Sequence, residues 1–389
     1  MKHDSHLGSA LRVLDSYEGR QPLAAFLKDF FRKHPQMGSR DRRTVSAFVY
    51  AAFRLGRALP HASPEDRILT GLFLCETSSV EGLAYFKPEW DARIAAPLDE
   101  KLACLEKAGL PVSLSAVFPW PEALSTGVEH LPFARSFLKQ PRLYIRVRPQ
   151  RMPAVVRRLE EQGVAFEQRD DACLAFPNGT RIEQYLPDKS SYEIQDETSQ
   201  HVRDFFPLFA LPAGSWVWDS CAGSGGKSLL LFDRHPELRF CVSDIRPSIL
   251  KNLRQRFRSA GLRDYESIPA DLEKEIPAAC RNKDFQLVMA DVPCTGSGTW
   301  SRTPEQLFFF DPGRLTAFSE RQQRIAENVA AVLKPGTGLL YITCSIFRSE
   351  NESVVERLCE RRGLTLLKQE MLKGYERQAD SLFVAALTA

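Results

Sequence analysis

The chain has 389 residues, of which 43% are apolar and 26% charged, and its mean hydropathy of −0.27 is typical of a soluble protein with two or three domains. No apolar stretch approaches the ~20 residues that span a bilayer, and the first residues lack the apolar core of a signal peptide, so we expect a cytoplasmic protein without membrane contact. The net charge of +3 is too small to indicate a nucleic-acid binder by itself, so such a partner must be inferred from local patches.

The cysteine pattern argues against a metal site and against disulfides. The nine cysteines form no C-x-x-C pair and no Cys/His cluster with zinc spacing. An odd number of cysteines without a secretion signal indicates free thiols in a reducing compartment.

Residues 1–135 are predicted to form a helical domain without a catalytic constellation. One helix is predicted in the segment that starts with Ser39 as its N-cap, because apolar residues then recur at helical spacing: Val45, Phe48, Val49, Ala52 and Phe53. A second begins after Ser63, with Pro64 at its first position and Asp66 three residues beyond the cap.

Residues 140–193 are predicted to form a small α/β domain that binds RNA. In "RLYIRVRP" apolar and polar residues alternate as in a half-buried strand, the helix "MPAVVRRLEEQG" follows, and "VAFEQ" and "CLAF" are strand-like. Six arginines within seventeen residues, with Tyr144 among them, are either a phosphate-binding face with a stacking ring or a solvated charged surface. The candidate RNA-binding residues are Arg142, Tyr144, Arg146 and Arg148.

Residues 194–389 alternate between strands and helices, which predicts a parallel sheet with helices on both faces, a Rossmann-like α/β fold. The predicted strands are "SWVWDS", "RFCVSD", "YESIPA", "FQLVMAD" and "LLYITCS". In such sheets ligands bind at the carboxyl ends of the strands. Residues at or just past these ends form the predicted rim: Asp219, Asp244, Asp271, Asp291 and Cys344.

A glycine-rich turn follows the first of these strands and leads into a helix. In "WDSCAGSGGKS" the position that a P-loop needs as glycine is Cys221, and the G-x-G-x-x-G pattern is absent. The turn still offers free amide groups to a nucleotide-like cofactor. Asp244 is placed to accept hydrogen bonds from ribose hydroxyls and Asp271 to face an adenine amino group, which suits S-adenosylmethionine as well as NAD.

Two cysteines lie at the same predicted rim, beside Asp291. Cys294 follows Pro293, and Cys344 ends the last predicted strand. A thiolate there could attack carbon 6 of a pyrimidine and make carbon 5 nucleophilic, while a nearby acid stabilises the adduct through ring nitrogen 3. The residues alone leave open which thiol attacks.

Together these motifs resemble the Fmu/Sun/nucleolar-protein family of RNA (cytosine-5) methyltransferases. The similarity is carried by "DSCAGSGGK", "DVPCTGSGTWSRTPE", "YITCSIFRSENE" and "YEIQDETSQ", and residues 1–135 resemble more faintly the antitermination-factor-like domain of some bacterial members. One departure is that Gly223 and Ser224 stand where the family's cofactor loop has alanine and proline.

The resemblance implies a role for each motif. It makes Cys344 the nucleophile and Cys294 the residue that assists product release. Asp291, placed beside the thiols to act on ring nitrogen 3, is the third predicted catalytic residue. The resemblance also implies that S-adenosylmethionine is bound by Cys221, Ala222, Gly223, Ser224, Gly225, Gly226, Lys227, Asp244, Asp271 and Asp291.

The expected function is methylation of RNA by a monomeric enzyme that needs no metal. Ribosomal RNA is the first substrate class and transfer RNA the second. The rival hypotheses are a methyltransferase acting on DNA or protein, and a non-catalytic RNA-binding assembly factor that keeps the fold.

Overall fold

The computed structural model describes residues 2–389, which form two compact units. The first unit comprises the residues up to Glu122, Glu129–Gln140 and Trp300–Asp311; the second comprises Ala123–Val128, Pro141–Thr299 and Pro312–Ala389. The segment Trp300–Asp311 follows the predicted active-site loop in sequence, yet it belongs to the first unit.

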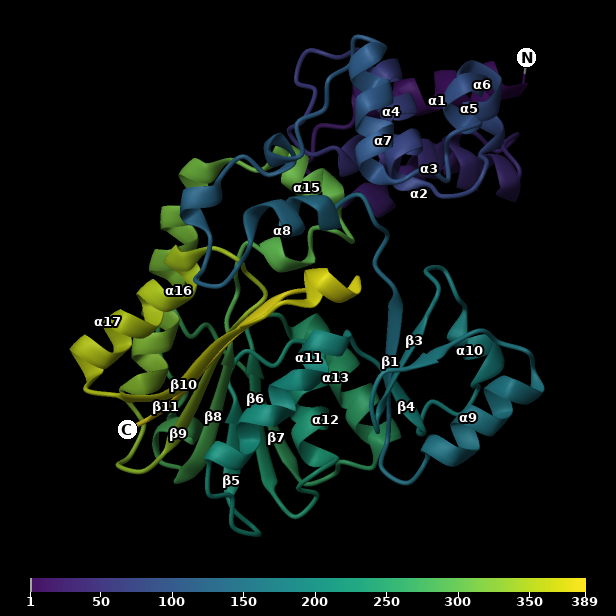
Figure 1. Cartoon of the computed structure of the whole chain (residues 1–389). Coiled ribbons are helices and arrows are strands. Elements are labelled where there is room, and N and C mark those ends of the chain that lie inside the picture. Colours follow the sequence, from purple (N-terminus) through teal and green to yellow (C-terminus); the bar gives the residue numbers. More distant parts are fainter. Residues whose placement is uncertain (1) are drawn as a thin grey trace. The chain divides into compact units, whose positions relative to one another are not determined.

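The first unit is helical (Figure 1). Its α-helices are α1 (Lys2–Ser16), α2 (Leu23–Lys33), α3 (Ser39–Arg54), α4 (Pro64–Cys75), α5 (Glu81–Phe86), α6 (Pro88–Asp91), α7 (Leu98–Lys107), α8 (His130–Ser136) and α15 (Pro304–Phe309). Ser63 caps α4 as predicted, because its hydroxyl accepts the N–H of Asp66 at 3.0 Å. The N-cap predicted for α3 is wrong by one residue: Gly38 is the cap, and its N–H donates to the side chain of Asp41.

The second unit contains two sheets. The smaller is antiparallel in the order β2-β3-β1-β4. Its elements are β1 (Leu143–Val147), α9 (Met152–Glu161), β2 (Glu167–Gln168), β3 (Cys173–Phe176), α10 (Ile182–Tyr185) and β4 (Tyr192–Ile194).

Strand β1 is predicted to be half-buried, but it is buried on both faces. Ile145 and Val147 pack in one apolar cluster, as expected from the alternation. On the opposite face Tyr144 packs against Ala379, so this side of the strand is also covered within the second unit.

The larger sheet has the order β10-β11-β9-β8-β5-β6-β7. Its strands are β5 (Trp216–Asp219), β6 (Arg239–Asp244), β7 (Tyr265–Pro269), β8 (Phe285–Asp291), β9 (Gly338–Thr343), β10 (Thr365–Leu372) and β11 (Leu382–Thr388). The strands from β5 to β9 pair in parallel, which confirms the predicted Rossmann-like fold. The hairpin of β10 and β11 was not predicted; β11 pairs with β9 in the antiparallel direction.

Helices cover the larger sheet (Figure 1). They are α11 (Glu197–His201), α12 (Gly226–Phe232), α13 (Pro247–Ala260), α14 (Ala278–Arg281), α16 (Leu315–Ala330) and α17 (Glu352–Arg362). Apolar side chains of α12 and α13 pack with those of the central strands in one buried cluster. Short 3-10 turns complete the chain: η1 (Ser115–Val117), η2 (Pro121–Ala123), η3 (Val202–Leu208), η4 (Ser297–Thr299), η5 (Pro312–Arg314), η6 (Arg348–Glu350) and η7 (Gly374–Arg377).

This strand order places the predicted rim at the topological switch point. From β5 the chain runs outward through β6 and β7, and then returns to β8 on the other side of β5. The loops that follow β5 and β8 diverge there, and an open parallel sheet binds its ligands in the resulting crevice.

Candidate active site

The glycine-rich loop after β5 adopts a conformation that needs its glycines. Gly223 and Gly225 have φ angles of +52° and +83°, and a Cβ on Gly225 would lie 2.4 Å from the ring of Phe257. Gly225 is the left-handed residue from which α12 starts. The loop therefore turns sharply and packs closely on α13, as few other residues would allow.

Asp244 holds this loop from the end of β6. Its carboxylate accepts the N–H of Gly223 at 3.0 Å and the N–H and Nε of Arg246 at 2.8 and 3.0 Å. Burial opposes ionisation of Asp244, but the hydrogen bonds from Arg246 and Gly223 outweigh it and lower its pKa. Asp244 is therefore a charged acceptor at neutral pH.

A cavity of about 350 Å³ opens beside the loop. Four of the predicted cofactor residues line it: Cys221, Asp244, Asp271 and Asp291. Ile245, which is 46% exposed, adds an apolar wall next to Asp244. Carboxylates that accept hydroxyl or amino hydrogens, beside an apolar surface for a ring, fit an adenosyl group, and the volume is in the range of small-ligand pockets.

Behind the loop lies a buried acid that titrates near neutrality. Asp219 is 1% exposed; one carboxylate oxygen accepts the hydroxyl of Ser228 at 2.6 Å, and the other has no partner among the described residues. Burial raises the pKa of Asp219 to about 7, and nearby Asp291 adds to the effect.

The two predicted thiols meet. Cys294 follows β8 and Cys344 follows β9, and because these strands are parallel neighbours both cysteines reach the same edge of the sheet. Their sulfur atoms are 3.2 Å apart. The contact with Cys344, together with burial and the nearby Glu350, raises the pKa of Cys294 well above its ordinary value, and either sulfur can donate the hydrogen of this contact.

A lysine and an acid form an ion pair next to the thiols. The Nζ of Lys227, in the first turn of α12, lies 2.5 Å from Asp291 at the end of β8. Burial disfavours the charge on Lys227, but Asp291 and, to a smaller extent, Cys344 outweigh burial and raise the pKa of the lysine. The amine is thus a cation beside Cys344.

Glu350 was not among the predicted site residues, yet it connects the two cysteine loops. It is fully buried and accepts the N–H and the hydroxyl of Thr295 at 2.9 and 2.6 Å, the amide of Gln322 at 2.8 Å, and the hydroxyl of Ser345. Thr295 and Ser345 directly follow Cys294 and Cys344. The sequence signal that could have revealed Glu350 is that a hydroxyl residue follows each cysteine, because two buried hydroxyl donors need an acceptor.

The candidate RNA-binding residues do not form an exposed face. Tyr144 and Arg146 are 2% exposed and Arg148 is 8% exposed. Both arginines pair with Asp233, Arg148 also with Glu193 at 2.6 Å, and the hydroxyl of Tyr144 donates to a carbonyl of the chain. The exposed face expected of these three residues is not found, because acids of the same unit pair with the two arginines and the ring of Tyr144 is buried. Arg142 is partly exposed and pairs with Glu167.

Two kinds of feature are absent from residues 2–389. Over this range no group of His, Cys, Asp or Glu is arranged to hold a metal ion. Within the same residues, no helix combines the length and the apolar character needed to cross a membrane.

Part of the second unit is similar to a family of known methyltransferases. Residues 208–384 match the family model described as 16S rRNA methyltransferase RsmB/F. Similar curated proteins named ribosomal RNA small subunit methyltransferase B occur in Xanthomonas campestris pv. campestris (31% identical over 242 residues, 60% of this chain and 52% of the relative) and in Pseudomonas syringae pv. tomato (31% over 206 residues, 52% and 44%). The chain thus spans about half the length of the curated relatives it matches.

Solved structures show the same fold. The crystal structure of PH0851 aligns with 100% of this chain and 98% of its own length at a TM-score of 0.70 and 21% identity. A methyltransferase homolog protein from Pyrococcus horikoshii aligns with 74% of this chain and 98% of its own at a TM-score of 0.56 and 20% identity.

Residues 208–384 therefore resemble RsmB/F-type methyltransferases, which confirms the predicted resemblance to the Fmu/Sun/nucleolar-protein family. The match to this methyltransferase family also confirms S-adenosylmethionine as the predicted cofactor.

Proposed function

We propose that this protein is an S-adenosylmethionine-dependent ribosomal RNA (cytosine-5) methyltransferase that works through a covalent bond between Cys344 and the target base. The observation that carries the proposal is the 3.2 Å approach of Cys294 and Cys344 at the ends of two adjacent strands, next to a cavity with the acids that an adenosyl group needs. When bound, S-adenosylmethionine supplies the methyl group.

The surroundings of the two thiols support Cys344 as the nucleophile. A thiolate attacks far better than a thiol, and only one member of a close thiol pair ionises readily. Cys294 has a raised pKa and therefore attacks less readily, while the Lys227 cation lies close to Cys344 and would stabilise a thiolate there. Sulfur of Cys344 then bonds to carbon 6 of the cytosine, and the electron pair of the ring double bond moves so that carbon 5 accepts the methyl group.

The same pair supports Cys294 as the base for release. Once Cys344 is bonded to carbon it has no thiol group that could ionise, so its part in raising the pKa of Cys294 is lost. Cys294 then loses its proton more readily and can take the proton from carbon 5. The electrons restore the ring double bond and the bond to Cys344 breaks.

The ion pair of Lys227 and Asp291 is proposed to face the cytosine ring. Carbon 6 accepts a nucleophile more easily when ring nitrogen 3 receives a hydrogen bond or proton. The pair holds both a donor and an acceptor at the strand end, so it can supply a proton to nitrogen 3 and accept the exocyclic amino group. Asp291 keeps its predicted role, with Lys227 as its partner.

Ribosomal RNA is the proposed substrate class, because the matched family and the curated relatives carry that activity in their names. The target base must leave its stack to reach the thiols, so a single-stranded or flipped-out cytosine is expected. We propose that the protein acts as a monomer.

The test is to trap the covalent intermediate. The Cys294→Ala variant, expressed in cells and run on a denaturing gel, should give a slow-migrating band that ribonuclease removes, since the adduct forms but cannot resolve. The double variant with Cys344→Ala should lack it, and Cys359→Ala, which changes a cysteine of α17, is the matched control that should also lack it. Sequencing the attached RNA identifies the substrate; an absent band with cofactor still bound would favour the non-catalytic assembly factor.

A further inference from the structure

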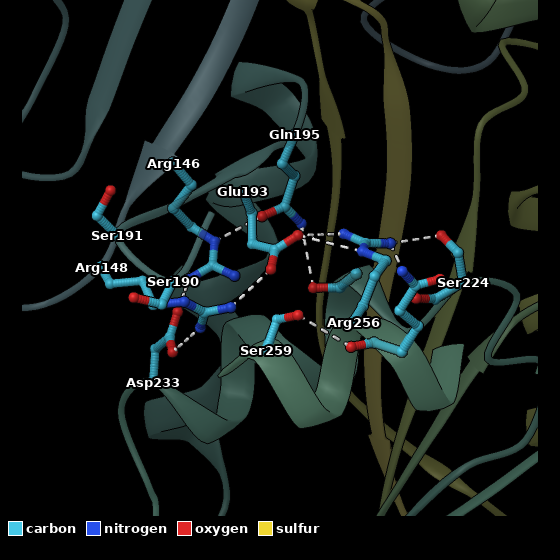
Figure 2. A network of polar contacts seen from close by, with 12 residues as sticks. Arg146, Arg148, Ser190, Ser191, Glu193, Gln195, Ser224, Asp233, Arg256 and Ser259 are labelled. Atoms are coloured by element: carbon cyan, nitrogen blue, oxygen red, sulfur yellow. Dashed lines mark hydrogen bonds and ion pairs between the residues drawn. The ribbon is translucent and has the colours of Figure 1, made fainter. Parts of the chain in front are cut away.

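The buried arginines of the smaller sheet belong to a network that reaches the cofactor loop. Figure 2 shows Arg148 and Arg256 on either side of Glu193, with Ser224 at the far end. Arg148 donates to one oxygen of Glu193 at 2.6 Å, and Arg256 donates through Nε and Nη2 to the other at 3.1 and 2.6 Å. Glu193 lies on β4 and Arg256 on α13, so the network joins the two sheets of the second unit.

Arg256 ends this network on the loop itself. Its Nη1 donates to the carbonyl of Ser224 at 2.9 Å and to the hydroxyl at 2.5 Å (Figure 2). Ser224 stands between Gly223 and Gly225, the two residues with positive φ. Glycine is the residue whose backbone loses most freedom on ordering, so the segment most in need of restraint is the one that Arg256 holds.

A second branch of the network contacts α12, the helix that follows the loop. Arg146 donates to Gln195 at 2.6 Å, and Gln195 in turn donates to the carbonyl of Gly226, the first residue of α12, at 3.4 Å. Asp233, the residue that caps the other end of α12, receives Arg146 and Arg148. The smaller sheet and Gln195, which follows it, therefore contact both ends of α12, and the sheet reaches the loop before α12 through Arg256.

We propose that Arg256, anchored by Glu193, is a positioning residue that keeps the cofactor loop in its binding conformation. Arg256 and Glu193 are absent from the lining of the cofactor cavity, so they act through Ser224 and its neighbour Gly223. Gly223 donates its N–H to Asp244, which does line the cavity, so a loosened Ser224 also loosens the hydrogen bond on the cofactor acid. The smaller sheet, whose arginines resembled an RNA face, has on this proposal the task of ordering the loop.

The first experiment measures the loop directly in the protein without ligand. Arg256→Gln should speed hydrogen exchange of the Ala222, Gly223 and Gly225 amides, which all donate hydrogen bonds within or from the loop. Arg254→Gln changes an exposed arginine of the same helix and should leave these amides as in the unaltered protein. Unchanged exchange in Arg256→Gln would overturn the proposal.

The anchor is tested in the same way. Glu193→Gln should also speed exchange of the loop amides, because Arg256 loses its charged partner. If Arg256→Gln loosens the loop but Glu193→Gln does not, the part of the proposal that assigns the anchor to the smaller sheet is wrong.

The second experiment rests on the proposed function and measures S-adenosylmethionine binding by calorimetry. Arg256→Gln should weaken binding by roughly two- to fivefold, the cost of ordering a looser loop, and Arg254→Gln should not. Ser224→Ala should weaken binding in the original background and add nothing in Arg256→Gln, because Arg256→Gln already loses the hydrogen bond to the hydroxyl that Ser224→Ala removes. If the losses of affinity in the two single variants add up in the double variant, Arg256 does not act through Ser224 and the proposal is wrong. If the unaltered protein does not bind S-adenosylmethionine, the proposed function is wrong, and the exchange experiment still tests the role of Arg256.

Discussion

Glu350→Gln tests whether one buried carboxylate sets the positions of both thiols. Two of the four donors on Glu350 are hydroxyls, those of Thr295 and Ser345, and both bond to the same oxygen. The other oxygen accepts the N–H of Thr295 and the amide of Gln322. Glutamine can keep that second oxygen and turn its NH₂ group toward the two hydroxyls, which can rotate and accept.

This geometry gives a magnitude. Two hydrogen bonds from hydroxyls to a carboxylate become two hydrogen bonds between neutral groups, at a cost of about 1 kcal/mol each, so the free energy of unfolding should fall by about 2 kcal/mol. Alanine would remove the Glu350 oxygen that accepts the N–H of Thr295 and would open a cavity, so glutamine is the more informative change.

Two measurements test this prediction, one of stability and one of the rate of adduct formation. Urea unfolding measures the free energy, and the rate at which the Cys294→Ala protein forms its RNA adduct should fall on the order of tenfold when Glu350→Gln is added, because reacting atoms tolerate little misplacement. Cofactor affinity should stay the same. Glu360→Gln, at an exposed position of α17, is the matched control.

The reasoning fails if Glu350→Gln unfolds at the same urea concentration as Glu360→Gln, or if it forms the adduct at the original rate. The first result would mean that the carboxylate contributes no more than an amide does. The second would mean that the hydrogen bonds to Thr295 and Ser345 do not position the sulfur atoms.

Three further predictions concern single charges. Asp219 binds its proton more tightly in the folded state, with a pKa of about 7 against an ordinary 3.8, so its contribution to stability is complete below about pH 4 and is lost as the pH rises through about 7. In urea unfolding, the free energy by which the unaltered protein exceeds Asp219→Asn should therefore shrink by about 4 kcal/mol over this range. A difference that stays constant with pH would contradict the raised pKa of Asp219. Arg148→Gln should lower the free energy of unfolding by about 3 kcal/mol because it breaks buried ion pairs, while the salt slope of RNA binding stays the same; a slope smaller by about one would instead show a phosphate contact. Asp244→Ala should weaken S-adenosylmethionine binding about tenfold or more in calorimetry with little effect on RNA affinity, since a charged acceptor is lost, and an unchanged affinity would remove Asp244 from the cofactor site.

The positions of the strand ends were predictable because apolar runs stop abruptly. The run that ends at Asp291 and the one that ends at Cys344 are β8 and β9, and parallel pairing brings their carboxyl ends to one edge. The proximity of Cys294 and Cys344 therefore follows from local patterns plus one rule of topology. The hairpin of β10 and β11 could not be predicted, because β10 is exposed along most of its length and lacks a clear apolar alternation.

The buried charges were not predictable in the same way, because the sequence pattern of an exposed arginine and that of a buried, paired one are identical. Arg146 alternates with apolar neighbours on β1 as a solvent-facing residue would, and its partner Asp233 lies 87 residues further along the chain. Glu350 presents the same difficulty, since its donor Thr295 is 55 residues away. Periodicity indicates which side of an element a residue occupies, but only the tertiary structure decides whether that side faces water or a complementary charge. For this reason Arg146 and Arg148, which the sequence pattern suggested as RNA-binding residues, are instead proposed to support the cofactor loop.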